Sequence, residues 1–335
     1  MTADLGAALA AHRGVASVAD LVRAGVSRKV CHWAVSSGTA LRVGRGVVAD
    51  PAVWASLDDR GRHVSVCRAL VGRCRSEVVL AAHSAAVAWG LPTRGGPPRT
   101  PVLLQRRTAG RPEFGGRSES AVRRRAWVRD DDLAEVEGLA VTSLARTVVD
   151  VARHEPVVWG LAAADAARAR GGTREDLLAA VHAVGPVPGS RRAALVARWA
   201  DGRAESPLES VARGTVLLLG LPPPDLQVRL DVGDRRYRVD LLVREFCTVV
   251  EVDGKVKYED REQSWRDKRR RDDLLETGHE VARFVASDAY RPARWGRRLL
   301  QTFQRAAARH GLPDPAVDPS FPSYHSLPPT WRLDA

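Results

Sequence analysis

The sequence predicts a multidomain α+β protein built from three zones with different patterns. At 335 residues the chain is longer than one ordinary hydrophobic core organises, so two or three domains are expected. Near the N-terminus, two capped helices precede two short strand pieces. Towards the C-terminus, a capped helix is followed by three strands with tight turns, a basic helix and another strand.

These zones set the expected domain boundaries. They are a helical and stranded N-terminal part (1–55), a mostly helical middle part with a few strands (56–202), a C-terminal α/β part with a mixed sheet (203–310) and a Pro-rich tail (311–335).

Composition points to a polyanionic partner. Lys and Arg number 52 against 40 Asp and Glu, which gives a formal net charge of +12 and a pI near 10.4. Such a charge favours nucleic acid, because each neutralised phosphate releases counterions. The chain has no apolar run of about 18 residues and no secretory signal pattern, so we expect a cytoplasmic protein that makes no membrane contact.

The N-terminal zone has the spacing of a helix-turn-helix. Ser17 can cap a first helix, which Gly25 ends, and Ser27 can cap a second helix over 28–37. The stretch LRVGRGVVA follows as two short strand pieces around Gly44 and Gly46, as expected for a small β wing.

A second helix in this position would carry the residues that meet DNA. The candidates are the polar side chains near its N-terminal, outward side and the basic residues of the wing: Arg28, Lys29, His32, Arg42 and Arg45.

This order of helix, GVSR, helix and basic wing resembles the N-terminal winged-helix domain of antitoxins in the type IV abortive-infection family. The resemblance covers about 50 residues. It implies DNA binding and a toxin nucleotidyltransferase as functional counterpart. The middle zone also resembles these proteins, and no residue there suggests chemistry.

The C-terminal zone begins with a strong helix start and contains an anomalous carboxylate. Ser206, Pro207 and Glu209 read as an N-cap, a first-turn proline and a capping glutamate, a role in which Glu209 would simply bond backbone. Asp240 lies inside the apolar strand RYRVDLLV. A buried carboxylate there is costly unless it is paired or binds metal.

The next strand, CTVVEVD, carries Glu251 and Asp253 on one face, and adjacent strands could place Asp240 beside Glu251. Clustered carboxylates repel one another, and Mg²⁺ or Mn²⁺ relieves that repulsion and can activate a water for phosphodiester hydrolysis. Lys255 is the candidate cation that would stabilise the developing charge. The alternative is that Glu251 and Asp253 merely solvate the end of a strand.

The C-terminal zone resembles the PD-(D/E)XK nuclease superfamily, and within it the branch related to very-short-patch repair endonucleases. The matching stretches are ESPLES at 205–210, RVD at 238–240, VEVDG at 250–254, DxxR at 267–270 and GHEVxRF at 278–284. The resemblance implies a restriction-endonuclease-like fold with Asp240 and Glu251 as metal ligands and Glu209 as an accessory acid.

One position departs from that superfamily: Asp253 stands where a lysine is usual, which makes it a candidate third ligand and puts activity in doubt. The basic helix after the strand offers a possible face for the DNA backbone, namely Lys268, Arg269, Arg270 and Arg271.

Two functions follow from these patterns. The leading hypothesis is a DNA-binding protein whose C-terminal domain hydrolyses phosphodiester bonds with Mg²⁺. The alternative is a non-catalytic DNA-binding transcriptional regulator, similar to a type IV antitoxin, with a degenerate nuclease fold.

Overall fold

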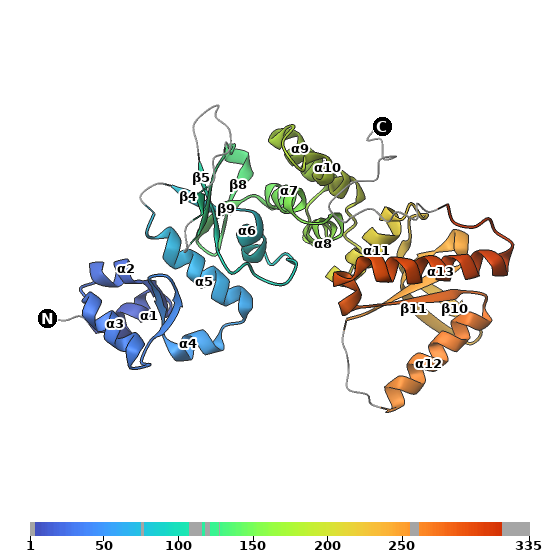
Figure 1. Ribbon diagram of the computed structural model, residues 1–335, viewed down its shortest axis with the longest axis horizontal. Coiled ribbons are helices and arrows are strands. Elements are labelled where there is room, and N and C mark those ends of the chain that lie inside the picture. The colour runs from blue at the N-terminus through green and yellow to red at the C-terminus, as the bar shows by residue number, and fades with distance from the viewer. Residues whose placement is uncertain are drawn as a thin grey trace. The chain divides into compact units, whose positions relative to one another are not determined.

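The computed structural model describes residues 4–74, 77–106, 116–117, 121–126, 128–254 and 261–316. The chain divides into two compact units, Met1–Val151 and Ala152–Ala335. Each unit combines helices with a sheet, so the predicted multidomain α+β class is confirmed (Figure 1). The four-part division remains a prediction. Most of the tail from residue 311 lies outside the described residues.

The first unit begins with a winged helix. Its elements are α1 (Leu5–Ala11), β1 (Val15–Ser17), α2 (Val18–Arg23), α3 (Arg28–Ser36), β2 (Leu41–Gly44) and β3 (Val47–Ala49). The strands form an antiparallel sheet in the order β1-β3-β2. The helix-turn-helix and the two wing strands lie where the sequence predicts them, and β1 is an additional strand.

Local chemistry fixes these elements. The Ser17 hydroxyl accepts a hydrogen bond from the Asp20 N–H, and the Ser27 hydroxyl accepts one from the Val30 N–H, so each serine caps its helix. Gly25 has a φ of +93° in the turn between α2 and α3, and Gly46 has a φ of +67° in the turn between β2 and β3. Glycine adopts this left-handed backbone without strain.

The strands β1 and β3 are apolar on both faces. On one face, Ala16 and Val48 pack in the core of the winged helix with Leu21 of α2 and Cys31 of α3. On the other face, Val15, Val47 and Ala49 belong to a second core. That core includes Val64 and Cys67 of α5 (Asp59–Val71), with α4 (Pro51–Ser56) leading into this helix. The winged helix is therefore continuous with the rest of its unit.

A six-stranded mixed sheet fills the remainder of the first unit. Its order is β6-β7-β5-β4-β9-β8. The strands are β4 (Val78–Leu80), β5 (Val102–Arg106), β6 (Gly116–Arg117), β7 (Val122–Ala126), β8 (Leu133–Val136) and β9 (Leu139–Thr142), with α6 (Ala82–Ala88) and η1 (Asp130–Asp132) between them. The middle of the chain thus has more strands than expected, because most of them span five residues or fewer and show little alternation.

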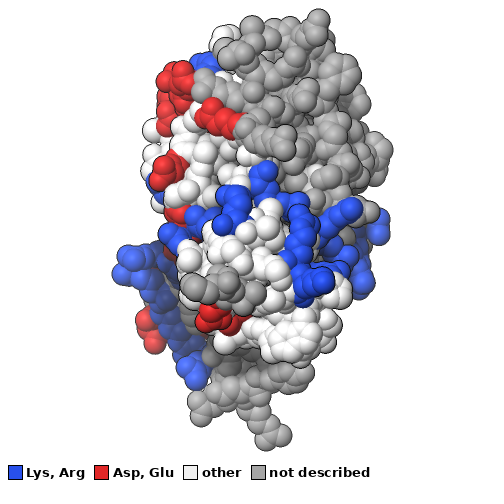
Figure 2. Space-filling view, turned by 90° about the vertical axis from the view of Figure 1, so that its left-hand side faces the viewer, with Lys and Arg blue, Asp and Glu red and all other residues white. Residues whose placement is uncertain are grey.

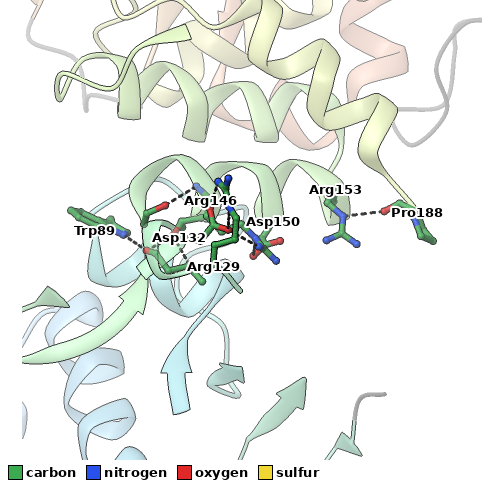
Figure 3. Close-up of polar contacts among 10 residues, drawn as sticks. Trp89, Arg129, Asp132, Arg146, Asp150, Arg153 and Pro188 are labelled. Carbon is green, nitrogen blue, oxygen red and sulfur yellow. Dashed lines mark hydrogen bonds and ion pairs between the residues drawn. The ribbon is translucent and has the colours of Figure 1, made fainter. Parts of the chain in front are cut away.

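Buried ion pairs join η1 to the start of α7 (Leu144–His154) (Figure 3). Arg146 Nε lies 3.1 Å from Asp150 Oδ2, and Arg146 Nη1 lies 3.5 Å from Asp132 Oδ2. All three side chains are buried, and the more exposed Arg129 also pairs with Asp132. Close by, the Trp89 indole N–H donates to the Thr142 carbonyl. These contacts fix the strand-to-helix connection.

The second unit starts with a helical layer. It contains α8 (Val157–Arg168), α9 (Arg174–Val184) and α10 (Ser190–Trp199). Arg213 of α11 (Pro207–Leu218) donates from Nη2 to both carboxylate oxygens of Asp165 on α8, at 2.8 Å each. Both side chains are almost fully buried. This pair binds the helical layer to the C-terminal fold within the second compact unit.

The C-terminal fold is a four-stranded sheet in the order β10-β11-β12-β13. Its elements after α11 are β10 (Asp225–Val232), β11 (Arg235–Val243), η2 (Arg244–Phe246), β12 (Thr248–Asp253), α12 (Arg261–Glu276), β13 (Glu280–Val285), η3 (Ala286–Tyr290) and α13 (Pro292–His310). The first three strands are antiparallel, and β13 runs parallel to β12. The expected mixed sheet is thus observed. Among the described helices, none has the length and apolar character needed to cross a bilayer.

Candidate functional site

The outward face of α3 carries three polar side chains. Arg28, Lys29 and His32 are exposed, whereas Cys31 and Ala34 on the inward face are 3% and 1% exposed. Helical spacing explains this division, because residues three and four apart share a face: His32 lies with Arg28 and Lys29, and Cys31 lies with Ala34. The structure therefore places these three predicted DNA-binding residues on one surface, which we call the α3 face.

The wing adds two further cations to this part of the molecule. Arg42 on β2 and Arg45 in the following turn are both exposed. A Cβ added at Gly46, next to Arg45, would lie 3.3 Å from Arg73 Nη1, a tight contact that a small shift of the arginine would relieve. Arg73 in turn donates to the Arg45 carbonyl at 3.2 Å, which fixes the backbone of the wing turn.

The segment that contains the α3 face and the wing carries cations and no acid of its own. Residues 21–49 contain no Asp or Glu, and their cations are Arg23, Arg28, Lys29, Arg42 and Arg45. Figure 2 views the molecule from the side on which the winged helix lies in Figure 1, and Lys and Arg form a band across the middle of this face. A surface of this kind attracts a phosphate backbone.

The helix before α3 is fixed by a carboxylate that faces inward. Asp20 is 8% exposed, accepts a hydrogen bond of 2.5 Å from the Ser17 hydroxyl and pairs with Arg23. Arg23 also donates to the Gly72 carbonyl at the end of α5, at 3.2 Å. The acid nearest in sequence to the α3 face is thus used to hold α2 in place.

In the second unit, the predicted acids lie on α11, β11 and β12. Glu209 is buried, and its Oε2 accepts hydrogen bonds from the Glu205 N–H at 2.9 Å and from Gln227 Nε2 at 2.7 Å. Burial raises the pKa of Glu209, and the negative charge of Asp240 raises it further, while these hydrogen bonds act in the opposite direction. Glu209 therefore bonds backbone, as a capping residue would, and also lies close to Asp240.

Asp240 is half-buried, and its Oδ2 accepts a hydrogen bond of 2.8 Å from the Val252 N–H, between the two acids of β12. Burial raises the pKa of Asp240, and the Val252 N–H and the Arg270 and Arg238 guanidinium groups partly offset that increase. The register pairs Leu241 with Val250, so Asp240 and Glu251 occupy the next facing positions.

The two acids of β12 each contact an arginine. Arg270 Nε lies 2.8 Å from Glu251 Oε1, at an angle that departs from that of a hydrogen bond. Arg270 Nη2 also donates to the Arg238 carbonyl at 2.7 Å, and the guanidinium lies 5.7 Å from the centre of the Tyr237 ring. Asp253 pairs with Arg283 of β13 at 2.5 Å. A guanidinium thus occupies the side of Glu251 that faces α12.

In the structure, a protein donor contacts each of the three carboxylates Asp240, Glu251 and Asp253. Within the described parts of the chain, no three His, Cys, Asp or Glu side chains are grouped so as to hold a metal. Lys255, the candidate catalytic cation, lies outside the described residues. Mg²⁺ binding by Asp240, Glu251 and Asp253 therefore stays a prediction.

The basic residues of α12 divide into two groups. Lys268, Arg269 and Arg271 are exposed, and Lys268 Nζ lies 5.7 Å from the centre of the Trp265 ring, a side chain 71% exposed. Arg270, by contrast, faces β11 and β12. Of the four predicted backbone-contacting residues, three therefore point to solvent and one anchors the helix to the sheet.

Comparison with known proteins supports the N-terminal interpretation. Residues 7–49 match the model of a family described as "Transcriptional regulator, AbiEi antitoxin". This segment is antitoxin-like. The matched stretch spans α1 to β3, the whole winged helix. The nuclease resemblance of the C-terminal zone receives no such support.

A longer stretch of the chain is similar to a protein of Mycobacterium tuberculosis. This protein, described as uncharacterized and matched in two strains, is 34% identical over 181 residues, which cover 52% of this chain and 65% of the relative. The chain thus spans slightly less than two thirds of the length of these curated relatives.

Two residues of interest were missed by sequence reasoning. Trp33 is 65% exposed on the α3 face, and a helical projection of α3 from the Ser27 cap would have placed it there. Gln227, which holds Glu209, has no sequence signal, because only the strand and helix packing brings it near.

Proposed function

We propose that this protein is a DNA-binding transcriptional regulator of the antitoxin type, and that α3 and the wing contact the DNA. The observation that carries the proposal is a segment without acids that exposes the three polar residues of the α3 face and the two arginines of the wing. In a winged helix, a helix placed like α3 enters the major groove, and the basic wing contacts the adjacent backbone. The family match over residues 7–49 supports the same role.

The proposal is tested by the salt dependence of DNA binding. The full chain is used to select duplexes from a random-sequence pool, and affinity for a selected duplex is measured by fluorescence anisotropy between 50 and 200 mM salt, a range in which about 6 to 10 phosphate contacts change affinity steeply. Arg28→Ala and Lys29→Ala are each expected to weaken binding and to reduce the log–log salt slope by about 1.

Arg174→Ala is the matched control, because Arg174 is an exposed arginine at the start of α9, in the second unit. It should leave both affinity and slope unchanged. If the wild-type chain retains no duplex from the pool, or if Arg28→Ala and Lys29→Ala behave like the control, the proposed DNA-binding surface is wrong.

A toxin of the nucleotidyltransferase class is the proposed functional counterpart, by analogy with the antitoxin family that the winged helix matches. Regulation of a neighbouring toxin gene would use the same α3 face. In a cell that expresses such a toxin, co-expression of this chain should restore growth, and the Lys29→Ala variant should raise transcription from the shared promoter.

Metal-dependent DNA cleavage is a second candidate. It is supported by the influence of the Asp240 charge on the pKa of Glu209, and by the β11–β12 pairing of Leu241 with Val250, the residues next to Asp240 and Glu251. Supercoiled plasmid incubated with Mg²⁺ or Mn²⁺ provides the test. Nicking by the wild-type chain that disappears in both Asp240→Ala and Glu251→Ala would establish it. Equal backgrounds in all three proteins would leave the regulator as the function.

A further inference from the structure

Trp33 stands out on the α3 face because a large apolar side chain there is 65% exposed. It follows His32 directly and lies one helical turn beyond Lys29, on the exposed side of α3. A single exposed apolar residue is ordinary on a protein surface. Its position one turn from a cation of the α3 face calls for a more specific explanation.

Hydroxyl groups near the C-terminal end of α3 donate hydrogen bonds to backbone carbonyls of the helix. Ser36 Oγ donates to the His32 carbonyl at 2.7 Å, and Ser37 Oγ donates to the Ala34 carbonyl at 3.3 Å. Thr39 Oγ1, just beyond the helix, also donates to the Ala34 carbonyl at 3.2 Å. Because these hydroxyl protons are directed at the backbone, Trp33 is the large side chain that this half of the helix presents to a partner.

The surrounding charge selects the partner. Residues 21–49 lack any acid, and along the sequence Trp33 lies between the cations at the start of α3 and those of the wing. Duplex DNA supplies phosphates for those cations on either side of a groove, and base edges between them. In the major groove, thymine alone presents a methyl group, which apolar side chains contact.

We propose that Trp33 is a specificity-determining residue that contacts the 5-methyl group of a thymine in the major groove. The inference rests on the proposed DNA-binding function, and it adds the chemical group that is read. Arg28, Lys29 and the wing arginines would fix the register on the backbone, as phosphate contacts do, while Trp33 would distinguish one base pair from another.

The experiment uses the full chain and a duplex selected from the random pool, in which each thymine is replaced in turn by deoxyuridine. This replacement removes only the methyl group. One deoxyuridine substitution is expected to weaken wild-type binding several-fold. Trp33→Ala should weaken binding of the thymine duplex about 10-fold, within the range of a specific base contact. The same deoxyuridine substitution should then cause no further loss in Trp33→Ala, as expected for two groups in one contact.

Two Trp33 variants distinguish a contact with a base from a contact with the phosphate backbone. Trp33→Phe keeps an apolar ring and should retain most of the discrimination between thymine and deoxyuridine. Trp33→Ala should leave the log–log salt slope unchanged, whereas Lys29→Ala should reduce it by about 1 on every duplex. Because Trp33 is exposed, its variants are expected to fold, and circular dichroism checks this.

The proposal is overturned if Trp33→Ala binds the selected duplex like the wild-type chain, or if it loses affinity equally for thymine and deoxyuridine duplexes. It is also overturned if Trp33→Ala changes the sedimentation of the DNA-free protein, because Trp33 would then be a contact between copies of the chain. If the wild-type chain binds no duplex at all, the DNA-binding function itself fails, which is a separate result.

Discussion

Among single residues, His63 on α5 shows how burial makes stability depend on pH. The ring is 7% exposed, and its Nε2 lies 3.0 Å from the Ser84 hydroxyl, which accepts a hydrogen bond from the Val102 N–H. Burial lowers the pKa of His63 from 6.5 to about 4, although the Pro98 backbone favours the protonated form. The folded first unit therefore keeps this ring neutral at pH values where the unfolded chain protonates it.

We expect the first unit to lose stability as the pH falls through this window. Between pH 6.5 and about 4 the unfolded state binds a proton that the folded state does not, so the contribution is complete above pH 6.5 and decreases towards pH 4. The total is about 3 kcal/mol. Urea unfolding of the wild-type chain and of His63→Gln at several pH values measures it.

His63→Gln cannot protonate, so its stability should fall less than that of the wild-type chain between pH 6.5 and pH 5. Parallel curves for the two proteins across that interval would show that His63 is not the group responsible. His182, which is on α9 in the second unit, provides the control variant His182→Gln, for which parallel curves are expected.

The sequence predicts the role of a single side chain correctly where that role depends on residues close to it in the chain. Ser17 and Ser27 were identified as caps, because a capping hydroxyl acts on a backbone N–H three residues away. The anomalous Asp240 was also identified, yet its hydrogen bond to the Val252 N–H was not. Arg270 was expected to contact DNA, and its ion pair with Glu251 depends on how α12 packs on the sheet, which no local pattern encodes.

At the scale of elements, the wing turn depends on one glycine. Gly46 has a φ of +67°, whereas Gly44 at the end of β2 lies outside the left-handed region. An alanine at Gly46 would adopt a strained backbone at a cost of about 1 kcal/mol. Gly46→Ala should therefore lower the unfolding midpoint and weaken DNA binding, because Arg45 next to it would be displaced.

Gly44→Ala is the matched control for this prediction. A Cβ at Gly44 would meet Val47 at ordinary contact distances, starting at 3.6 Å, so the change in stability should be within about 0.5 kcal/mol. Chemical denaturation and anisotropy on the selected duplex measure both effects. Equal behaviour of the two variants would mean that the wing turn tolerates the left-handed strain.

Elements with strong signals were predicted well, and very short ones were not. The two helices of the helix-turn-helix (α2 and α3), the strands β10 to β13 and the capped α11 lie near their expected positions. The strand β1 was missed, because Val15–Ser17 is only three residues long and is buried throughout, so it shows no alternation. It exists because β3 supplies its hydrogen-bonding partner.

For the whole molecule, the buried pair of Asp165 and Arg213 decides which helices fold together. Arg213→Met would leave the Asp165 carboxylate buried without its partner and should destabilise the second unit by about 3–5 kcal/mol. Replacing both residues, as Asp165→Leu with Arg213→Met, should recover most of that loss, because no uncompensated charge remains. Thermal unfolding followed by circular dichroism measures the three proteins.

The same variants test whether the two units unfold independently. DNA binding through α3 should survive Arg213→Met at temperatures where the second unit has unfolded, because α3 belongs to the first unit. Loss of DNA binding together with the second unit would show that the two unfold as one. A stability change below about 1 kcal/mol in Arg213→Met would contradict the role of the pair itself.

The strands β1 and β3 are apolar on both faces. As a result, the end of the sequence similarity does not coincide with the end of the hydrophobic core that these strands share. Sequence similarity to the antitoxin family stops at residue 49, where β3 ends. Yet Val15, Val47 and Ala49 rest against α5, beyond that limit. Recombination that transplanted only the similar stretch would leave an uncovered apolar sheet surface prone to aggregation. The winged helix can therefore be transplanted intact only together with the helix that covers its back.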